Sequence, residues 1–273
     1  MLKKFTVILS IILIVVFTLS YSFYKYKIQR SNNKININYN TYANNYEMEY
    51  KVINGSLYGK GKNNLGLFGK EKYGFYNDWV IIVETNNIIH IDVMNGTIIY
   101  LTDNGDVYGL GNSEGIFDTN EELILIPKLL FEDCKFVSLG IKSALFLKKD
   151  NTLWFVGESK NGQSTYIKNN FFSPIQIAKD VVFAKAFGYT NVWLDENKSL
   201  YLCGDNSYGQ IGNGSKGSGF PTLYKDIVSE PYLAIENCCG FSIINEQTIE
   251  AVTEDGKTYI WGGEYGNTPS LRK

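Results

Sequence analysis

A glycine-rich stretch in the C-terminal half, LYLCGDNSYGQIGNG (residues 200–214), has residue types and spacing that could bind a phosphate group. Glycines at 212, 214 and 217 follow the G-x-G-x-x-G pattern, which binds pyrophosphate where a strand leads into a helix N-terminus. The next residues, SGFPTLY, are no helix start, and a P-loop would need lysine where Ser215 stands. We therefore interpret the glycines as structural, with the amides of Asn206 and Gln210 satisfying loop backbone groups.

Residues for nucleophilic catalysis or metal binding are scarce. The chain has one histidine, His90, which lies in an apolar run and which any Ser-His-Asp or Cys-His arrangement would have to use. No G-x-S-x-G motif accompanies it, and the cysteines, Cys134, Cys203, Cys238 and Cys239, show no C-x-x-C spacing. Buried free thiols are expected, with an extracytoplasmic disulfide as the alternative. We predict that the protein is not an enzyme and carries no metal and no cofactor.

The charge distribution argues against nucleic-acid binding. The net charge is −2, but residues 1–30 hold five basic residues and no acid, so the remainder has 26 − 5 = 21 basic residues against 28 acidic ones. A body with a charge of −7 lacks the excess of basic residues that phosphate contacts need.

The N-terminus predicts a membrane anchor. Residues 5–24, FTVILSIILIVVFTLSYSFY, carry no charge, and twenty helical residues span about 30 Å, the thickness of a bilayer core. We expect residues 1–30 to form a single-pass signal-anchor that leaves the body outside the cytoplasm. The alternative is a signal peptide cleaved near Ser22, which would release a secreted protein. The polar, Asn-rich residues 31–45 are predicted to form a tether, with alternating apolar residues that could add one strand.

The rest of the chain, residues 46–273, repeats. Five units each place an aromatic residue three positions before a glycine, and the aromatics are 50, 46, 47 and 58 residues apart. A period in this range indicates a solenoid or a propeller. The five pairs are Tyr58/Gly61, Tyr108/Gly111, Trp154/Gly157, Tyr201/Gly204 and Tyr259/Gly262.

The segments between these units also resemble one another. Residues 88–103, 135–150 and 181–196 each have the length of two short strands and are rich in Val, Ile, Phe and Tyr. Asp-Asn-Gly at 103–105 and Asp-Gly at 255–256 have the chemistry of hairpin turns, so the recurring aspartates Asp103, Asp150 and Asp255 are interpreted as turn residues. One repeat therefore supplies about four antiparallel strands, and we predict an all-β propeller of about five four-stranded blades.

The pattern GDNSYGQIGNG, with an aromatic strand before it and a proline after it, resembles the regulator of chromosome condensation repeat. Only the fourth copy is complete. The resemblance is to a bacterial, membrane-anchored member, and it implies a recognition surface. The family usually builds seven blades, so five copies imply either a closed ring of five or an open arc. The matching positions are Pro127, Pro174 and Pro221 for the proline, and Gly140, Gly188 and Gly240 for the glycine between the two inner strands.

The remaining candidate site is a binding surface. Two segments that depart from the repeat, residues 72–79 and 168–174, read as loops with exposed aromatics. Tyr76, Trp79, Phe171 and Phe172 could bind a protein partner, because aromatics are enriched at interaction hot spots; alternatively they cover the groove between blades. We expect a non-catalytic binding module for a protein partner. The alternatives are a glycan-binding module of the cell envelope and, third, an enzyme with a site at the channel mouth.

Overall fold

The computed structural model describes residues 37–45, 47–63, 65–67, 74–113, 115–117, 121–165, 168–217 and 226–272. The chain divides into two compact units, residues 1–36 and residues 37–273, and only the second contains described residues. No helix in the described ranges has the length and apolar character needed to cross a bilayer. The apolar run at residues 5–24 lies outside those ranges, so the predicted anchor stays a prediction.

Five four-stranded antiparallel sheets make up the second unit, and the strands of each sheet pair in chain order. Each sheet is called a blade below, numbered from the N-terminus. Blade 1 holds β1 (Tyr42–Asn45), β2 (Met48–Ile53), β3 (Ser56–Lys62) and β4 (Phe75–Val83). Blade 2 holds β5 (Ile88–Met94), β6 (Thr97–Thr102), β7 (Val107–Asn112) and β8 (Leu123–Phe131). Blade 3 holds β9 (Cys134–Gly140), β10 (Ser143–Lys148), β11 (Leu153–Ser159) and β12 (Lys168–Ala178).

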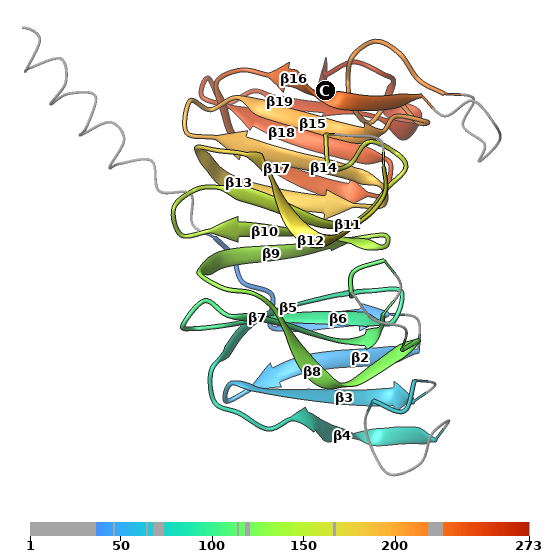
Figure 1. Cartoon of the computed structure of the whole chain (residues 1–273). Coiled ribbons are helices and arrows are strands. Elements are labelled where there is room, and N and C mark those ends of the chain that lie inside the picture. The colour runs from blue at the N-terminus through green and yellow to red at the C-terminus, as the bar shows by residue number, and fades with distance from the viewer. Residues whose placement is uncertain are drawn as a thin grey trace, which may run out of the picture. The chain divides into compact units, whose positions relative to one another are not determined.

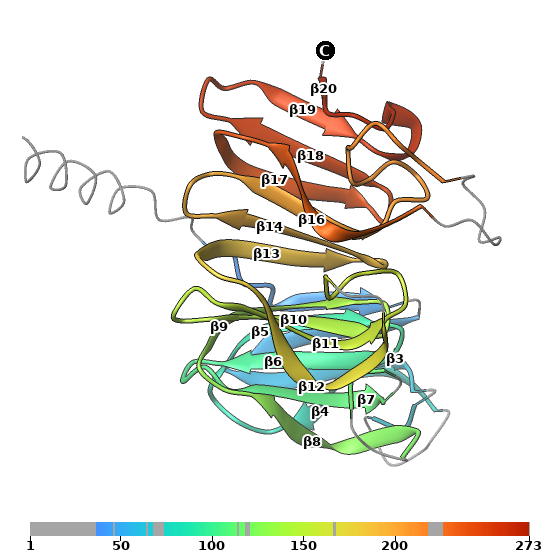
Figure 2. The same cartoon turned by 45° about the horizontal axis from the view of Figure 1, so that its top comes forward.

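Blade 4 holds β13 (Val181–Phe187), β14 (Thr190–Asp195), β15 (Leu200–Asp205) and β16 (Ile227–Ile235). Blade 5 holds β17 (Cys238–Asn245), β18 (Thr248–Thr253), β19 (Thr258–Trp261) and β20 (Ser270–Leu271), with a short 3₁₀ turn η1 (Gly263–Tyr265) before β20. Within this unit, blade 5 lies at the top of Figure 1 and blade 1 at the bottom, at opposite ends of the series, as an open arc requires. Figure 2 shows the strands of blade 5 from a second direction. The predicted all-β fold of five four-stranded blades is confirmed.

The five repeat aromatics occupy one equivalent site. Tyr58, Tyr108, Trp154, Tyr201 and Tyr259 are each half-buried near the start of the third strand of their blade. In blades 1 to 4 the pairing with the fourth strand shifts register immediately before this residue. The repeat in the sequence is therefore a repeat in backbone geometry and environment.

Neighbouring blades are joined by one recurring hydrogen bond. We call the first strand of a blade its inner strand and the fourth its outer strand. In blades 2 to 5, the first residue of the inner strand donates its N–H to a carbonyl in the hairpin turn between the second and third strands of the preceding blade. Because the same bond recurs at all four joints, each of blades 2 to 5 contacts the hairpin turn of the preceding blade at an equivalent position. The four bonds are Ile88 to Gly55 (3.0 Å), Cys134 to Gly105 (2.8 Å), Val181 to Asn151 (2.9 Å) and Cys238 to Lys198 (2.8 Å).

The hydrophobic core lies between the blades. Blade 1 packs Tyr50 and Leu57 against Ile98 and Tyr100 of blade 2, and corresponding clusters fill the joints between blades 2 and 3 and between blades 3 and 4. Each interior blade is therefore apolar on both faces, as stacking on two neighbours requires.

The two end faces differ from the interior ones. Lys51 of blade 1 pairs with Tyr58, where blade 2 pairs Tyr100 with Tyr108. On the same face, Lys60 Nζ lies 2.9 Å from Glu49 Oε1. At the other end, Arg272 forms an ion pair with Glu250. Terminal repeats of stacked proteins carry such polar outer faces.

Candidate interaction surface

The glycines that suggested a phosphate loop are required by backbone geometry. Gly61, Gly111, Gly157, Gly204 and Gly262 all have φ between 83° and 122°. A Cβ on any of them would lie 2.0 to 2.3 Å from a carbonyl oxygen just before the second strand of the same blade. Only glycine combines this φ with this close approach. We call the connection between the third and fourth strands of a blade its glycine loop.

Two buried amides organise the glycine loop of blade 4. Asn206 Oδ1 accepts from the N–H of Ile211 (2.9 Å), and its Nδ2 donates to Asp226 Oδ2 (2.6 Å) and Asn213 Oδ1 (3.0 Å). Gln210 Oε1 accepts from the N–H of Tyr208 (2.9 Å). The amides satisfy loop backbone groups, as the sequence predicted.

The glycine loops also hold the next blade. The carbonyl of Gln210 accepts a bond from Trp261 Nε1 of blade 5 (2.9 Å). One blade earlier, the carbonyl of Gln163 accepts from Asn191 Nδ2 of blade 4 (2.8 Å) and lies 3.3 Å from Cys203 Sγ. Through these backbone carbonyls, the glycine loop of one blade is hydrogen-bonded to the next blade.

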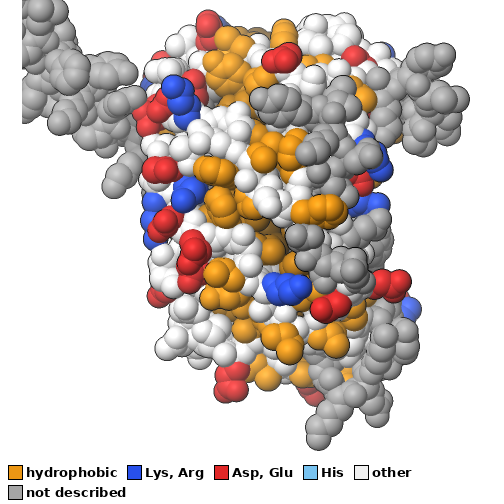
Figure 3. Space-filling view, in the orientation of Figure 1, with side chains coloured by type: hydrophobic (Ala, Val, Ile, Leu, Met, Phe, Trp, Pro, Cys, Tyr) orange, Lys and Arg blue, Asp and Glu red, His pale blue; other side chains and the backbone are white. Residues whose placement is uncertain are grey.

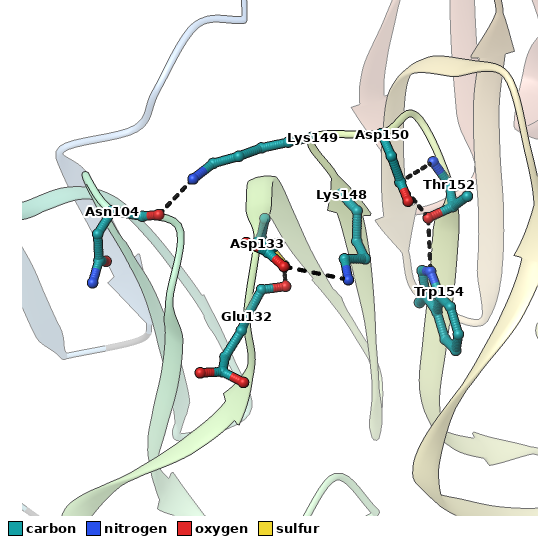
Figure 4. Close-up of polar contacts among 9 residues, drawn as sticks. Asn104, Glu132, Asp133, Lys148, Lys149, Asp150, Thr152 and Trp154 are labelled. Carbon is teal, nitrogen blue, oxygen red and sulfur yellow. Dashed lines mark hydrogen bonds and ion pairs between the residues drawn. The ribbon is translucent and has the colours of Figure 1, made fainter.

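Asp150 serves its hairpin in the same way (Figure 4). In blade 2 the equivalent residue is Asn104 and not Asp103, because Asn104 Oδ1 accepts from the N–H of Asp106 (3.2 Å). Asp150 Oδ1 accepts from the N–H and Oγ1 of Thr152 (3.0 and 2.6 Å), whose Oγ1 accepts from Trp154 Nε1 (2.8 Å). The bond from the Thr152 hydroxyl lowers the pKa of Asp150 below its usual value. Asp255 likewise accepts from Thr253 and Lys257 across its turn. Within the described ranges, no three His, Cys, Asp or Glu residues are grouped to hold a metal ion.

The cysteines of the described chain are all free thiols, and three of them are buried. Burial raises the pKa of Cys134 and Cys203 to about 12 and that of Cys238 to about 11. Cys239 is exposed, so the expectation of buried thiols holds for three of the four.

The two segments that the sequence predicts as loops are outer strands. Most of residues 72–79 lies in β4, and residues 168–174 lie in β12. The sequence did not predict these two strands because a bulge interrupts the alternation of residues along each of them. Gly59 and Gly61 pair with Val80 and Tyr76, so three residues of β4 lie opposite one residue of β3.

The same bulge recurs on the outer strands of blades 2, 3 and 4. Its last residue is Pro127, Pro174 or Pro231, and in blade 1 it is Trp79. The repeat proline of blade 4 is therefore Pro231 and not Pro221, which lies outside the described residues. Proline fits there because a bulge on an edge strand leaves its position without a ladder bond.

The four predicted contact residues separate into two kinds. Tyr76 and Phe171 are equivalent, since each pairs with the repeat glycine of its own blade, Gly61 or Gly157. Both are half-buried and pack against the clusters between blades. Phe171 also meets Phe155 edge to face at 6.4 Å. These two side chains contribute to packing, as the groove-covering alternative expected.

Trp79 covers the end face of blade 1. Lys51 Nζ lies 4.0 Å and Lys60 Nζ 5.0 Å from the centroid of its indole ring. These cation–π contacts engage the face of the ring. The half-buried indole is thus part of the polar end face described above.

Phe172 is 46% exposed and occupies the first position of the blade 3 bulge. The bulge of blade 2 is more apolar still, with Leu125 57% and Ile126 80% exposed. Sequence reasoning missed these two. We call Leu125, Ile126 and Phe172 the rim residues. Figure 3 shows hydrophobic side chains along this face of the unit, over β8 and β12.

A scan against protein-family models finds no match. Solved structures do match, and three of them illustrate the likeness. Prp20p from Saccharomyces cerevisiae aligns with a TM-score of 0.68 and 14% identity, over 83% of this chain and 63% of that one. The fold is that of the regulator of chromosome condensation propellers. Human WBSCR16 aligns at 0.63 with 17% identity, over 83% and 65%, and yeast RCC1 (Prp20) bound to Kap60 at 0.62 with 19%, over 83% and 59%.

These likenesses establish the propeller fold. The chain spans less than two thirds of the length of each of the three matched structures. The structure of Prp20p is described together with its binding to Gsp1p and histones, and the other yeast structure is a complex with Kap60. Propellers of this fold thus include protein-binding ones.

Proposed function

We propose that this chain is a non-catalytic binding module that presents its propeller to a protein partner. The observation that carries the proposal is the exposure of the rim residues, which project from bulges that the fold repeats at every outer strand of blades 1 to 4. Exposed apolar groups on a rigid scaffold are typical of protein interaction sites. The protein-binding propellers of the same fold support this reading, although each is less than 20% identical to this chain.

We further propose that residues 1–30 anchor the module in the membrane, with the propeller outside the cytoplasm. The support for this part of the proposal is the run at residues 5–24, which is apolar, carries no charge and is long enough to span a bilayer as a helix.

The test is site-specific photo-crosslinking in intact cells, with a photoreactive amino acid at Ile126 and, as a matched control, at Ile244. Both are exposed isoleucines, 80% and 50%, but Ile244 lies on the inner strand of blade 5. The proposal predicts a protein adduct at 126, none at 244, and its loss on Leu125→Ser with unchanged urea unfolding.

Equal adducts at both positions, or none at any rim residue, would contradict a rim-binding site. Glycan-array binding without protein adducts would favour the glycan alternative instead. Protease shaving of intact cells, followed by membrane fractionation, tests the location separately. A propeller that stays intact under shaving would contradict the proposed orientation.

A further inference from the structure

Residues 37–41 form an inner strap that runs along the inner strands of the unit. The N–H of Asn40 donates to Nδ1 of His90 in β5 (2.8 Å), and the carbonyl of Asn40 accepts from the N–H of Ile91 (2.9 Å). The Tyr39 hydroxyl donates to the carbonyl of Lys135 in β9 (3.1 Å). Ile37 packs against the cluster between blades 3 and 4. The strap, which precedes β1 of blade 1, thereby contacts blades 2, 3 and 4.

His90 can bond to this strap only when its imidazole is neutral. Its Nδ1 accepts the bond from Asn40, so its Nε2 carries the proton and donates to the carbonyl of Val137 (3.0 Å). The side chain is fully buried. A second proton on Nδ1 would remove the acceptor and bring two N–H groups face to face, so the contact exists only for the neutral ring.

The imidazole is also one member of a column of rings along the inner strands. Rings from the strap and from blades 2 to 5 follow one another in this column, so the strap is held by a tilted ring contact as well as by hydrogen bonds. The centroid distances are 6.0 Å for Tyr39–His90, 4.7 Å for His90–Phe136, 5.1 Å for Phe136–Phe183 and 5.3 Å for Phe183–Phe241.

The charged groups on the packed elements do not stabilise a cation at this place. Lys185 on β13 disfavours a charged imidazole, and the backbone of Lys135 on β9 meets the strap. Asp92, on the same strand as His90, is engaged by the N–H of Leu139 (2.9 Å) and the hydroxyl of Ser138 (3.2 Å). Burial, the largest cause, lowers the pKa of His90 to about 4.

We propose that His90 is an acid-sensitive latch, and that protonation of its imidazole releases the inner strap from blades 2 and 3. Release would expose the ring column from Phe136 onward. It would also lengthen the connection between the propeller and the preceding segment by five residues, or about 17 Å of extended chain. A partner or a membrane anchor on that segment would then sit on a longer tether.

The size of the effect follows from linkage. With the strap closed, the pKa of His90 is about 4, and with the strap open the solvated ring returns toward 6.5. The closed form is favoured fully above pH 6.5, and the preference falls as the pH drops from 6.5 to 4, because the open form binds the proton more tightly. The ratio of open to closed strap then rises at most about 20-fold from pH 7 to pH 5 and about 100-fold to pH 4.

Amide hydrogen exchange in the full chain measures this ratio. The reporter amide is that of Ile91, which donates to the strap, and the reference is that of Cys134, which donates across a joint between blades. After correction for the intrinsic pH dependence of exchange, the protection of Ile91 is expected to fall by up to about 20-fold from pH 7 to pH 5, while that of Cys134 stays constant. Because the chain has one histidine, its imidazole titration by NMR gives the pKa directly.

His90→Phe is the matched variant, since it keeps a ring in the column but cannot titrate. It should show weaker protection of Ile91 at every pH and no acid-dependent fall. An equal fall in His90→Phe, or a wild-type ratio that does not change between pH 7 and pH 5, would overturn the proposal. If the variant does not fold, the wild-type comparison of Ile91 with Cys134 still decides.

Discussion

An exchange of residues between an end face and an interior face tests the stacking of the blades most severely. Lys51 and Tyr100 occupy equivalent positions, each paired with the repeat aromatic of its blade, Tyr58 or Tyr108. Lys51 is half-buried on the end face of blade 1, whereas Tyr100 is 5% exposed between blades 1 and 2. The two substitutions are Lys51→Tyr and Tyr100→Lys.

The expected losses of unfolding free energy differ because Tyr100 is buried, whereas Lys51 is only half-buried. An aromatic side chain buries roughly 150–250 Å², worth about 4–6 kcal/mol at about 25 cal/mol/Å². Tyr100 also stacks on Tyr108 at 5.4 Å, which adds about 1 kcal/mol. Since a lysine stem recovers part of the packing but leaves a charge to be solvated, Tyr100→Lys should lower the free energy of unfolding by about 4 kcal/mol or more. Lys51→Tyr loses one cation–π contact and should cost about 1 kcal/mol or less.

Urea unfolding followed by circular dichroism, with the same m-value for both variants, gives the two free energies. If Tyr100→Lys does not accumulate as folded protein, Tyr100→Val and Lys51→Val allow the same comparison with a smaller loss of unfolding free energy. Equal costs at the two positions would refute the assignment of one face as an end face and the other as a joint between blades.

Two further predictions concern backbone and thiols. Gly204→Ala should cost several kcal/mol, because φ is 119° and a Cβ would lie 2.3 Å from the carbonyl oxygen of Tyr189; Gly256→Ala, at φ 79° with no atom within 4 Å, should cost only about 1 kcal/mol in urea unfolding. Comparable losses would mean that the close approach at Gly204 does not exist. A thiol reagent should label one cysteine of the native protein, Cys239, and four after unfolding, since burial raises the pKa of Cys134 to about 12. Native labelling of Cys134 would contradict its buried position.

The repeat could be predicted from the sequence because its signals are local. The aromatic and the glycine three residues later lie on one strand, and the glycine is fixed by a contact within its own blade, as at Gly204 with Tyr189. The hairpin aspartates act over two to four residues, as Asp195 does with Asn197 and Ser199. Such patterns repeat with the period of the blades.

The outer strands could not be predicted, because their bulges break the alternation that identifies a strand. The segments containing Tyr76 and Phe171 therefore looked like loops. The proline of blade 4 was misassigned because its glycine loop is longer than the others, which moves the bulge to Pro231. The exposed pair Leu125 and Ile126 gave no signal, since their run reads as an ordinary buried strand.

The contact between His90 and the inner strap also could not be predicted from the sequence. The apolar surroundings of His90 predict a packed residue, which is confirmed, but its bond to the N–H of Asn40 joins residues 50 positions apart. All four predicted partner residues, Tyr76, Trp79, Phe171 and Phe172, stay predictions as binding residues. The cation–π contacts of Trp79 also place it in the end face of blade 1.

The central claim is that four equivalent joints hold five alike blades in one series. Native-state amide hydrogen exchange tests it at the four donors of the joint bonds, the N–H groups of Ile88, Cys134, Val181 and Cys238. All four are expected to exchange far more slowly than unprotected amides, and to lose protection on denaturant-induced unfolding. Exchange at the unprotected rate at any one of these amides, under native conditions, would show that its joint does not form and would contradict the account.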